Sequence, residues 1–595
     1  MRKKIVIIGG VAGGASAAAR LRRLDENLEI IILEKGDYIS FANCGLPYYI
    51  GNVIPNRDSL FLQTPTMLKN HLNIQARVAH EVIEIDKVNK TVTVKDLKTQ
   101  TTYLETYDKL ILSPGASPLL PKISGLSEAK NLFTLRNVPD TDKIKTFINI
   151  NQPKTATIIG GGFIGLEMAE NLKHLGLAVT IIEMAKQILP PLDFEMAAIA
   201  QNKLIENGIT LILNNGLKEI KDQGSTLILN DNTELHTDLT ILSIGVKPET
   251  AFTKTAALTL NNAGGIVVDE YFKTSDPHIY AVGDAIEVPH YITQAQTMLP
   301  LASPANRQGR LVADNLCGIK APYHGVLGSA VVKLFDLTIA TTGLNELQLQ
   351  KNNLDYKVIH LHPGSHAGYY PNSSPISLKL LFSKIDGKIF GAQALGTAGV
   401  EKRIDVIATA IKGNLTIEDL ADLELCYAPP FSSAKDPVAV AGYVAENIIT
   451  GKVQPVYWRQ LRDIEMENNF LLDVRTPDEF SLNTLPGAVN IPLDELRDRL
   501  DELPKDKMIY TFCAVGLRGY LAYRILVQHG FEKVRNLSGG LKTYHAAAAP
   551  IILREESENE VPAQPNANIQ QPADAQPQKT VSPVEAVKTI RVDAC

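Results

Sequence analysis

The sequence contains few cysteines, and they lie far apart. Only five occur in 595 residues, at Cys44, Cys317, Cys426, Cys513 and Cys595. None shows the paired Cys-x-x-Cys spacing of a metal site, and the set does not suggest a disulfide framework. We therefore expect no bound metal and a reducing compartment, the cytoplasm.

Long apolar runs and an excess of positive charge are also missing. No segment approaches the roughly 20 apolar residues of a membrane span, and the apolar run at residues 5–8 is too short for a signal peptide. A net charge of -6 excludes a general attraction to nucleic acid or anionic membranes. The length of 595 residues predicts several domains.

The first motif is a glycine-rich turn between a short apolar strand at residues 4–8 and an alanine-rich helix. Its glycines are Gly9, Gly10, Gly13 and Gly14. A second strand, predicted at residues 28–33, ends at Glu34. Such a turn lets the backbone approach a pyrophosphate, and the acid takes a ribose hydroxyl. Val11 replaces the middle glycine, so the strict dinucleotide pattern is broken here.

A second copy of the motif is intact. A strand predicted at residues 155–159 leads into Gly160, Gly162 and Gly165, a helix at 166–175 and a strand at 178–182 that ends at Glu183. The repeat predicts two bound dinucleotides. Glu183 favours a free ribose 2′-hydroxyl and so NADH over NADPH, although the nearby Lys186 weakens this preference.

Three further apolar strands stop at glycine turns, at Gly115, Gly245 and Gly283. Asp284 follows the last of them and places a carboxylate where it can accept hydrogen bonds from sugar-like hydroxyls.

The segment Ser-Phe-Ala-Asn-Cys-Gly-Leu-Pro-Tyr-Tyr-Ile-Gly at residues 40–51 holds Cys44 among small and apolar residues. A passage from strand to helix would set its sulfur at a helix start, which favours the thiolate. The pattern predicts a redox-active thiol.

Residues 1 to about 449 resemble the two-dinucleotide flavoprotein disulfide reductases. The Cys44 segment is similar to that of the coenzyme A disulfide reductases and of their rhodanese-fused, NADH-dependent persulfide reductase relatives. Dithiol members carry two cysteines separated by four residues, but the positions five away from Cys44 are Ile39 and Tyr49. Cys44 must therefore pair with a sulfur that arrives from outside.

The resemblance implies FAD as cofactor, with Asp284 at its ribityl chain. It also implies an order of domains: an FAD-binding domain in residues 1–112 and 246–322, an NAD-binding domain in 113–245 with its core at 150–245, and an α+β dimerisation domain in 323–450.

Two tyrosines are implied as part of the thiol site. In the family, two protomers form a homodimer and each lends residues to its partner, and the positions that match here are Tyr369 and Tyr427. Their hydroxyls can donate to a sulfur anion or protonate a leaving thiolate. The alternative is that they only pack at the dimer interface, and Tyr370 could take the place of Tyr369.

The first helix carries a clue to the substrate. Ser16, Arg20 and Arg23 recur at four- and three-residue steps, so they share one face. Guanidinium groups suit phosphates, although a solvated basic face is the plain alternative. Together with Ser40, Asn43 and Lys435 they fall at positions that resemble the coenzyme A contacts of the family.

Residues 454–550 resemble an α/β rhodanese domain. A strand predicted at residues 508–512 runs into the loop of Cys513, which leads into a helix. Backbone N–H groups in such a loop form a nest for an anion, and Arg518 adds a positive charge. The loop is expected to stabilise a thiolate and then a persulfide on Cys513.

Residues 551–595 are rich in Pro, Ala, Gln, Asn and Glu until about residue 583, which predicts a disordered linker. Residues 584–595 are strand-like again and resemble the first strand of small sulfur-carrier domains. A frayed tail is the alternative. Because the sequence offers no partner strand, residues 584–595 are expected to form an unpacked orphan strand. We predict that the natural chain continues past Cys595 into a sulfur-carrier partner domain that exchanges sulfur with Cys513.

The sequence therefore predicts an α/β oxidoreductase with two Rossmann-type domains, a dimerisation domain, a rhodanese domain and a disordered tail. Electrons would pass from NADH through FAD to Cys44, which cleaves a persulfide, polysulfide, or coenzyme A persulfide or disulfide. Two alternatives stay open: an NADH oxidase or peroxidase in which Cys44 cycles through sulfenic acid, and a sulfur-relay carrier protein.

Overall fold

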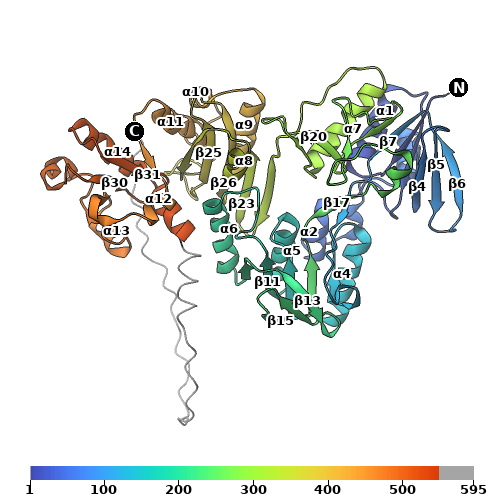
Figure 1. The fold of residues 1–595 in the computed structure, drawn as a ribbon, viewed down its shortest axis with the longest axis horizontal. Helices are drawn as coiled ribbons and strands as arrows, with labels where there is room; N and C mark the ends of the chain where they lie inside the picture. Colours follow the sequence, from blue (N-terminus) through green and yellow to red (C-terminus); the bar gives the residue numbers. More distant parts are fainter. Residues whose placement is uncertain (1, 549–595) are drawn as a thin grey trace, which may run out of the picture. The chain divides into compact units, whose positions relative to one another are not determined.

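The computed structural model describes residues 2–548, which form two compact units (Figure 1). Unit 1 comprises Met1–Leu361, Ile376–Asp422 and Ala441–Lys452, and unit 2 comprises His362–Pro375, Leu423–Val440 and the chain from Val453. The predicted linker, orphan strand and carrier domain lie outside the described residues.

Unit 1 begins with a five-stranded parallel sheet in the order β19-β7-β1-β2-β3. Its strands are β1 (Lys4–Ile8), β2 (Glu29–Glu34), β3 (Gln75–Val78), β7 (Lys109–Leu112) and β19 (Ile279–Ala281). Helix α1 (Ala12–Leu24) contacts β1 and β2 and lies beside α7 (Ala302–Leu316). A Cβ at Gly14 would lie 1.9 Å from the carbonyl oxygen of Gly9, so only glycine lets α1 approach β1 this closely.

A second parallel sheet repeats this arrangement in the order β12-β11-β10-β16-β9. Its strands are β9 (Leu132–Phe133), β10 (Thr155–Ile159), β11 (Ala178–Glu183), β12 (Thr210–Leu213) and β16 (Leu239–Leu242). The helices of this part are α4 (Val138–Asn151), α5 (Phe163–His174) and α6 (Phe194–Glu206). Strand cores such as Ile158 and Ile181 are fully buried because the apolar runs are covered by helices.

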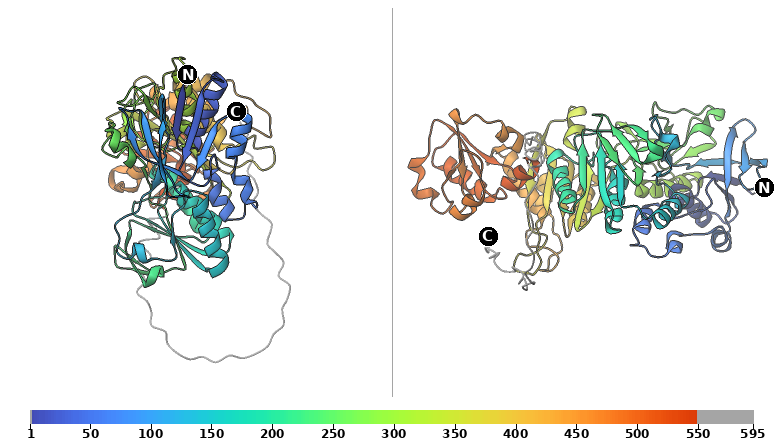
Figure 2. Two further views of the ribbon diagram at one scale, coloured as in Figure 1. Left: turned by 90° about the vertical axis from the view of Figure 1, so that its right-hand side faces the viewer. Right: turned by 90° about the horizontal axis from the view of Figure 1, so that it is seen from below.

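Smaller elements surround the two parallel sheets. The antiparallel sheets and pairs are β4 (His80–Asp86), β5 (Thr91–Asp96) and β6 (Thr102–Thr106); β13 (Leu217–Lys221), β14 (Thr226–Leu229) and β15 (Glu234–His236); and β8 (Ala116–Pro118) with β17 (Val246–Pro248). A mixed sheet joins β18 (Ile266–Val267), β20 (Ile286–Pro289) and β21 (Gln296–Thr297), and the short helices are α2 (Leu46–Ile50) and α3 (Pro65–Leu72). The blue strands β4 to β6 stand at an edge of unit 1 (Figure 2).

The third large sheet of unit 1 is antiparallel, in the order β22-β23-β26-β25-β24. Its strands are β22 (Ala330–Leu334), β23 (Leu337–Gly343), β24 (Tyr356–Leu361), β25 (Ser377–Ser383) and β26 (Ile389–Gly396). Helices α8 (Glu346–Lys351), α9 (Val400–Lys412), α10 (Ile417–Asp422) and α11 (Pro437–Ile449) accompany it, and α11 runs from unit 2 back into unit 1.

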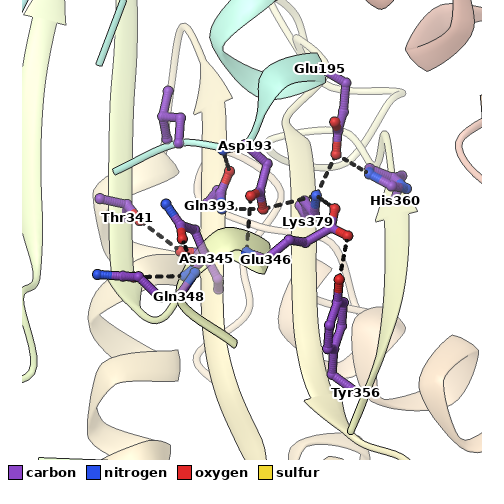
Figure 3. Close-up of polar contacts among 12 residues, drawn as sticks. Asp193, Glu195, Thr341, Asn345, Glu346, Gln348, Tyr356, His360, Lys379 and Gln393 are labelled. Atoms are coloured by element: carbon purple, nitrogen blue, oxygen red, sulfur yellow. Dashed lines mark hydrogen bonds and ion pairs between the residues drawn. The ribbon is translucent and has the colours of Figure 1, made fainter. Parts of the chain in front are cut away.

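A buried polar cluster connects this antiparallel sheet to the α6 region (Figure 3). Lys379 on β25 is fully buried and forms ion pairs with Asp193 at 2.9 Å and with Glu195 and Glu346. His360 Nε2 lies 2.9 Å from Glu195 Oε1. Gln393 donates a hydrogen bond to Asp193, and the Tyr356 hydroxyl donates one to Glu346. Although burial lowers it, these carboxylates raise the pKa of Lys379. The cluster thus ties β25 and α8 to the start of α6 through the ammonium of Lys379.

Unit 2 contains a parallel sheet in the order β27-β31-β30-β28-β29. Its strands are β27 (Pro455–Val456), β28 (Asn469–Asp473), β29 (Val489–Asn490), β30 (Met508–Phe512) and β31 (Val534–Leu537), and its helices include α12 (Trp458–Arg462), α13 (Pro477–Leu482) and α14 (Leu517–Gln528). Phe512 and Leu537 centre its hydrophobic core. The segments His362–Pro375 and Leu423–Val440 belong to the same unit, and His362 Nε2 lies 2.8 Å from Thr543 Oγ1.

In residues 2–548, no helix combines the length and the apolar character that a membrane crossing requires.

Candidate active site

Unit 1 holds a cleft of about 2660 Å³ where the predicted motifs converge. Its lining includes the turns at Gly9 and Gly160, the loop of Cys44, and Asp284. These residues come from both parallel sheets, at the carboxyl ends of strands β1, β10 and β19, where ligands bind in open α/β sheets.

The first glycine turn surrounds a carboxylate. Glu34 Oε2 accepts the N–H of Gly10 at 2.8 Å, and Oε1 accepts the N–H of Gly36 at 2.7 Å. Burial raises the pKa of this carboxyl. Glu34, Gly9, Gly10 and Gly13 line the cleft, while Gly14 faces Gly9.

The second turn repeats this geometry closely. Glu183 Oε2 accepts the N–H of Gly161 at 2.7 Å, and Oε1 accepts the N–H of Ala185 at 2.8 Å. Gly160 and Gly162 line the cleft, whereas Gly165 packs against the carbonyl oxygen of Gly160. Glu34 and Glu183 therefore occupy equivalent positions in two equivalent glycine turns. We call each turn, together with its acid, a dinucleotide cradle.

The other three predicted turns also line the cleft. Gly115, Gly245 and Gly283 all line the cleft with positive φ values of 70°, 117° and 85°. Burial raises the pKa of the Asp284 carboxyl beside them, and Arg136 opposes this shift. In each cradle the glycines leave room for a pyrophosphate to approach the backbone, and the acid can accept from a ribose hydroxyl. The two cradles therefore fit FAD and a nicotinamide dinucleotide.

Cys44 lies in a 3₁₀ turn, Asn43–Gly45, directly before α2 and is accessible from the cleft. The residues around Cys44 oppose the thiolate that its place before a helix was expected to favour. The surrounding protein desolvates the thiol, and with the carboxylates of Glu167 and Asp284 this raises the pKa of Cys44. Helix α2 has only 5 residues, so it provides little dipole to compensate.

Glu167 on α5 is a site residue that sequence reasoning missed. It lines the cleft and accepts a hydrogen bond from the Tyr48 hydroxyl at 3.3 Å. Burial raises the pKa of Glu167 to about 7. Its place two residues after Gly165, on the helix that the glycine turn opens, was the available signal.

Because Glu167 lies near Cys44, we expect its charge to change the pH at which the Cys44 thiol ionises. Ionised Glu167 opposes the thiolate, so Glu167→Gln lowers the pKa of Cys44 and moves its alkylation profile to lower pH. The measurement is the rate of iodoacetamide labelling of Cys44, followed by peptide mass spectrometry between about pH 6 and pH 10. Glu26→Gln, at an exposed position, serves as the control and should leave the profile unchanged. A shift to higher pH would contradict the argument.

The basic face of α1 is only partly directed at the cleft. Ser16, Arg23, Ser40 and Asn43 line it together with Cys44. Arg20 instead donates its Nε to Asp314 Oδ1 at 2.7 Å, on the neighbouring helix α7. Ser16 donates to Asn306 Oδ1 at 2.5 Å. The guanidinium of Arg20 is therefore already paired with a carboxylate, which weighs against a contact with phosphate.

The predicted tyrosines lie in unit 2, where their hydroxyl oxygens are 2.6 Å apart. Tyr369 is 76% exposed and Tyr427 is 48% exposed. The hydrogen bond to Tyr427 raises the pKa of Tyr369, so Tyr369 keeps its proton. Tyr370 makes an edge-to-face contact with the ring of His366. The backbone carbonyl of Lys435, another predicted site residue, accepts a hydrogen bond from the Ser433 hydroxyl.

Cys513 occupies a second thiol site in unit 2. It follows β30, is 1% exposed, and its Sγ accepts the N–H of Gly516 at 3.2 Å. Arg518, in the first turn of α14, forms a bidentate ion pair with Glu479.

The two dinucleotide cradles and the thiol in one cleft define a flavin- and pyridine-nucleotide-dependent oxidoreductase. The chain belongs to the pyridine nucleotide-disulphide oxidoreductase family. Residues 3–309 match the model of that family, residues 329–438 its dimerisation domain, and residues 457–547 the rhodanese-like domain.

Individual relatives agree with this assignment. The coenzyme A disulfide reductase of Staphylococcus epidermidis is 39% identical over 444 residues, 74% of this chain and 100% of the relative. The reduced Bacillus anthracis CoADR-RHD structure has a TM-score of 0.91 and 54% identity, over 92% of this chain and 99% of that one. The NAD-dependent persulfide reductase from A. fulgidus has a TM-score of 0.86 and 37% identity, over 91% and 100%. The predicted family, fold class and enzyme class are confirmed.

Glu183, the acid of the second cradle, is expected to determine the preference for NADH over NADPH. Replacing Glu183 by Gln removes the charge that repels a 2′-phosphate, so the ratio of kcat/KM for NADH over NADPH should fall about tenfold, or about 1.4 kcal/mol. Glu206→Gln on α6, where the carboxylate is 66% exposed, is the control. An unchanged ratio in Glu183→Gln would assign the preference to other residues.

Proposed function

We propose that this protein is a homodimeric, NADH-dependent flavoprotein that reduces persulfides, polysulfides, or coenzyme A persulfide and disulfide at Cys44. The rhodanese domain would handle persulfide sulfur at Cys513. The observation that carries this proposal is a cysteine without a neighbouring cysteine, open to the cleft that both dinucleotide cradles share. A single thiol of this kind must react with a sulfur brought by the substrate.

Cys44 acts as the nucleophile. Its thiolate attacks the sulfur–sulfur bond of the substrate, forms a mixed disulfide and releases a thiolate or sulfide. Two electrons from NADH then restore the Cys44 thiolate and release the remaining thiol; bound FAD supplies the redox centre between them. The raised pKa of Cys44 means that a thiol proton has to leave first, and Glu167 is the titrating group beside it.

The tyrosine pair provides the proton for a leaving sulfur. Tyr369 and Tyr427 share one short hydrogen bond and are both accessible, so either hydroxyl can donate outward. In the proposed homodimer each protomer lends this pair to its partner's thiol site. Tyr370, 43% exposed, remains the alternative to Tyr369.

Coenzyme A is the proposed carrier of the substrate sulfur. Arg23, Ser16, Ser40 and Asn43 line the same cleft as Cys44, and a cation with small polar groups suits a phosphate-bearing ligand. Lys435 would join them from the partner protomer. Arg20 would contribute only if it left Asp314.

Steady-state NADH consumption across a panel of substrates tests the proposal. Coenzyme A persulfide, coenzyme A disulfide and inorganic polysulfide should support turnover well above that with oxygen or hydrogen peroxide. Equal turnover with oxygen or peroxide would favour an NADH oxidase or peroxidase in which Cys44 forms a sulfenic acid.

The rhodanese half has its own test. If Cys513→Ser left NADH oxidation by small persulfides unchanged but abolished sulfur transfer to a protein acceptor, a sulfur-relay protein with a carrier partner would be the better description. Free thiols at Cys44, Cys317, Cys426 and Cys513 are consistent with the proposed cytoplasmic location.

A further inference from the structure

The mouth of the Cys513 site is built differently from a simple cationic pocket. Arg518 Nη1 donates to Glu479 Oε2 at 2.7 Å, and Nη2 donates to Oε1 at 2.6 Å. This bidentate pair uses two of the five guanidinium N–H donors, and Glu479, joined by the nearby Cys513, raises the pKa of Arg518. Arg518 therefore reaches the thiol site as half of an ion pair.

Glu479 is held in this place by the start of helix α13. The N–H and hydroxyl of Thr476 donate to Glu479 Oε2 at 3.1 and 3.2 Å, and the N–H of Glu479 donates to the Thr476 hydroxyl at 3.3 Å. This capping box fixes the carboxylate before any substrate binds. The Arg518 guanidinium lowers the pKa of Glu479 to about 2, so the pair is zwitterionic and neutral overall at physiological pH.

The segment that follows Cys513 exposes aliphatic side chains. Val515 is 39% exposed, Leu517 is 55% exposed and Leu521 is 42% exposed, and all three belong to the loop or helix that follows Cys513. The exposed groups named beside Cys513 are thus aliphatic side chains and an arginine whose charge is paired with Glu479. Such a surface offers little to a small dianion, which loses its hydration on entry.

We propose that Glu479 determines the substrate class of the rhodanese site: by pairing with Arg518 it selects persulfides whose alkyl group next to the sulfur is uncharged, such as a pantetheine arm, over the thiosulfate dianion. This inference rests on the proposed function, in which Cys513 handles persulfide sulfur. In the favoured reaction the Cys513 thiolate attacks the outer sulfur of R–S–SH; Cys513–S–SH forms and R–S⁻ leaves. With thiosulfate the same attack would form the persulfide and release sulfite.

Loading of Cys513 by two sulfur donors tests the proposal. Full-length enzyme without NADH is mixed with pantetheine persulfide or with thiosulfate, and the gain of one sulfur atom on the Cys513 peptide is followed by mass spectrometry. Wild type should load faster from pantetheine persulfide. Glu479→Gln keeps a capping side chain but frees the charge of Arg518, so the thiosulfate rate relative to the persulfide rate should rise about tenfold or more.

Two variants separate charge from structure. Glu502→Gln removes the carboxylate from a matched fork in the same domain, where Arg499 contacts Glu502 at 2.7 and 2.8 Å, and should leave the donor ratio unchanged. Thr476→Ala weakens the capping box that positions Glu479 but keeps its charge, so the donor ratio should rise less than in Glu479→Gln. Iodoacetate against iodoacetamide labelling of Cys513 gives a second readout, because only the anionic reagent should gain in Glu479→Gln.

An unchanged donor ratio in Glu479→Gln, or an equal loss with both donors, would overturn the proposal. Both results are distinguishable from a failure of the proposed function, because loading at Cys513 is measured without NADH and does not depend on turnover at Cys44.

Discussion

Replacing Cys44 by serine should abolish NADH-linked reduction of sulfur substrates, by at least about 10³-fold in kcat. The physical reason is that a serine hydroxyl cannot form or release a bond to sulfur, and the adjoining segment contains no second thiol. Cys44 does not belong to the glycine turns of either cradle, so FAD should stay bound and NADH should still bleach the flavin absorbance. The measurements are steady-state turnover with coenzyme A persulfide and anaerobic titration with NADH.

Cys317→Ser is the matched control, because Cys317 is a free cysteine of the same unit outside the cleft lining and ends helix α7. It should keep normal turnover. Substantial turnover in Cys44→Ser would remove Cys44 from the mechanism, and loss of flavin in that variant would show that the residue supports the fold of the cleft instead.

The sequence was most informative where structure depends on neighbouring residues. The strands predicted at residues 4–8, 155–159 and 508–512 have these bounds in the structure, because each is a short apolar run that ends at a glycine or cysteine turn. The predicted helix at residues 166–175 begins three residues earlier, at Phe163, because the helix opens within the glycine turn. The carboxylates of Glu34 and Glu183 were also predictable, because each ends the strand that follows a glycine turn and accepts an N–H of that turn.

Contacts between distant segments were not predictable. The pairing of Arg20 with Asp314 joins residues 294 positions apart, and the contact of Tyr48 with Glu167 spans 119 positions. Both change the chemistry: the first occupies a predicted phosphate ligand, and the second brings a carboxyl to the thiol site and opposes its ionisation. Helical spacing shows which side chains share a face, but it does not show which residues of distant segments contact that face.

The Lys379 cluster leads to the largest expected effect on stability. Lys379→Met keeps the volume of the side chain but removes the buried ammonium that Asp193, Glu195 and Glu346 share, so that Glu195 keeps only its contact with His360 among these ion pairs. Breaking a buried ion pair from one side costs about 3–5 kcal/mol, because the remaining charges stay desolvated. The loss should appear as faster hydrogen exchange of β25 amides and a lower urea midpoint for unit 1.

Lys384→Met is the comparison, since the pair of Lys384 with Asp355 is exposed on both sides and should be worth less than about 1 kcal/mol. The pH dependence gives a sharper test. In wild type, Lys379 and His360 overcome the effect of burial and hold the pKa of Glu195 well below its usual range, so its contribution to stability is present above the unfolded pKa and lost in acid. Burial raises the pKa of the Asp193 carboxyl and opposes the lowered pKa of Glu195, so without Lys379 both should titrate above their unfolded values and the deficit should grow as pH rises from about 4 to about 7. A deficit of the same size at both ends of that range would mean that Lys379 acts by packing and not by charge.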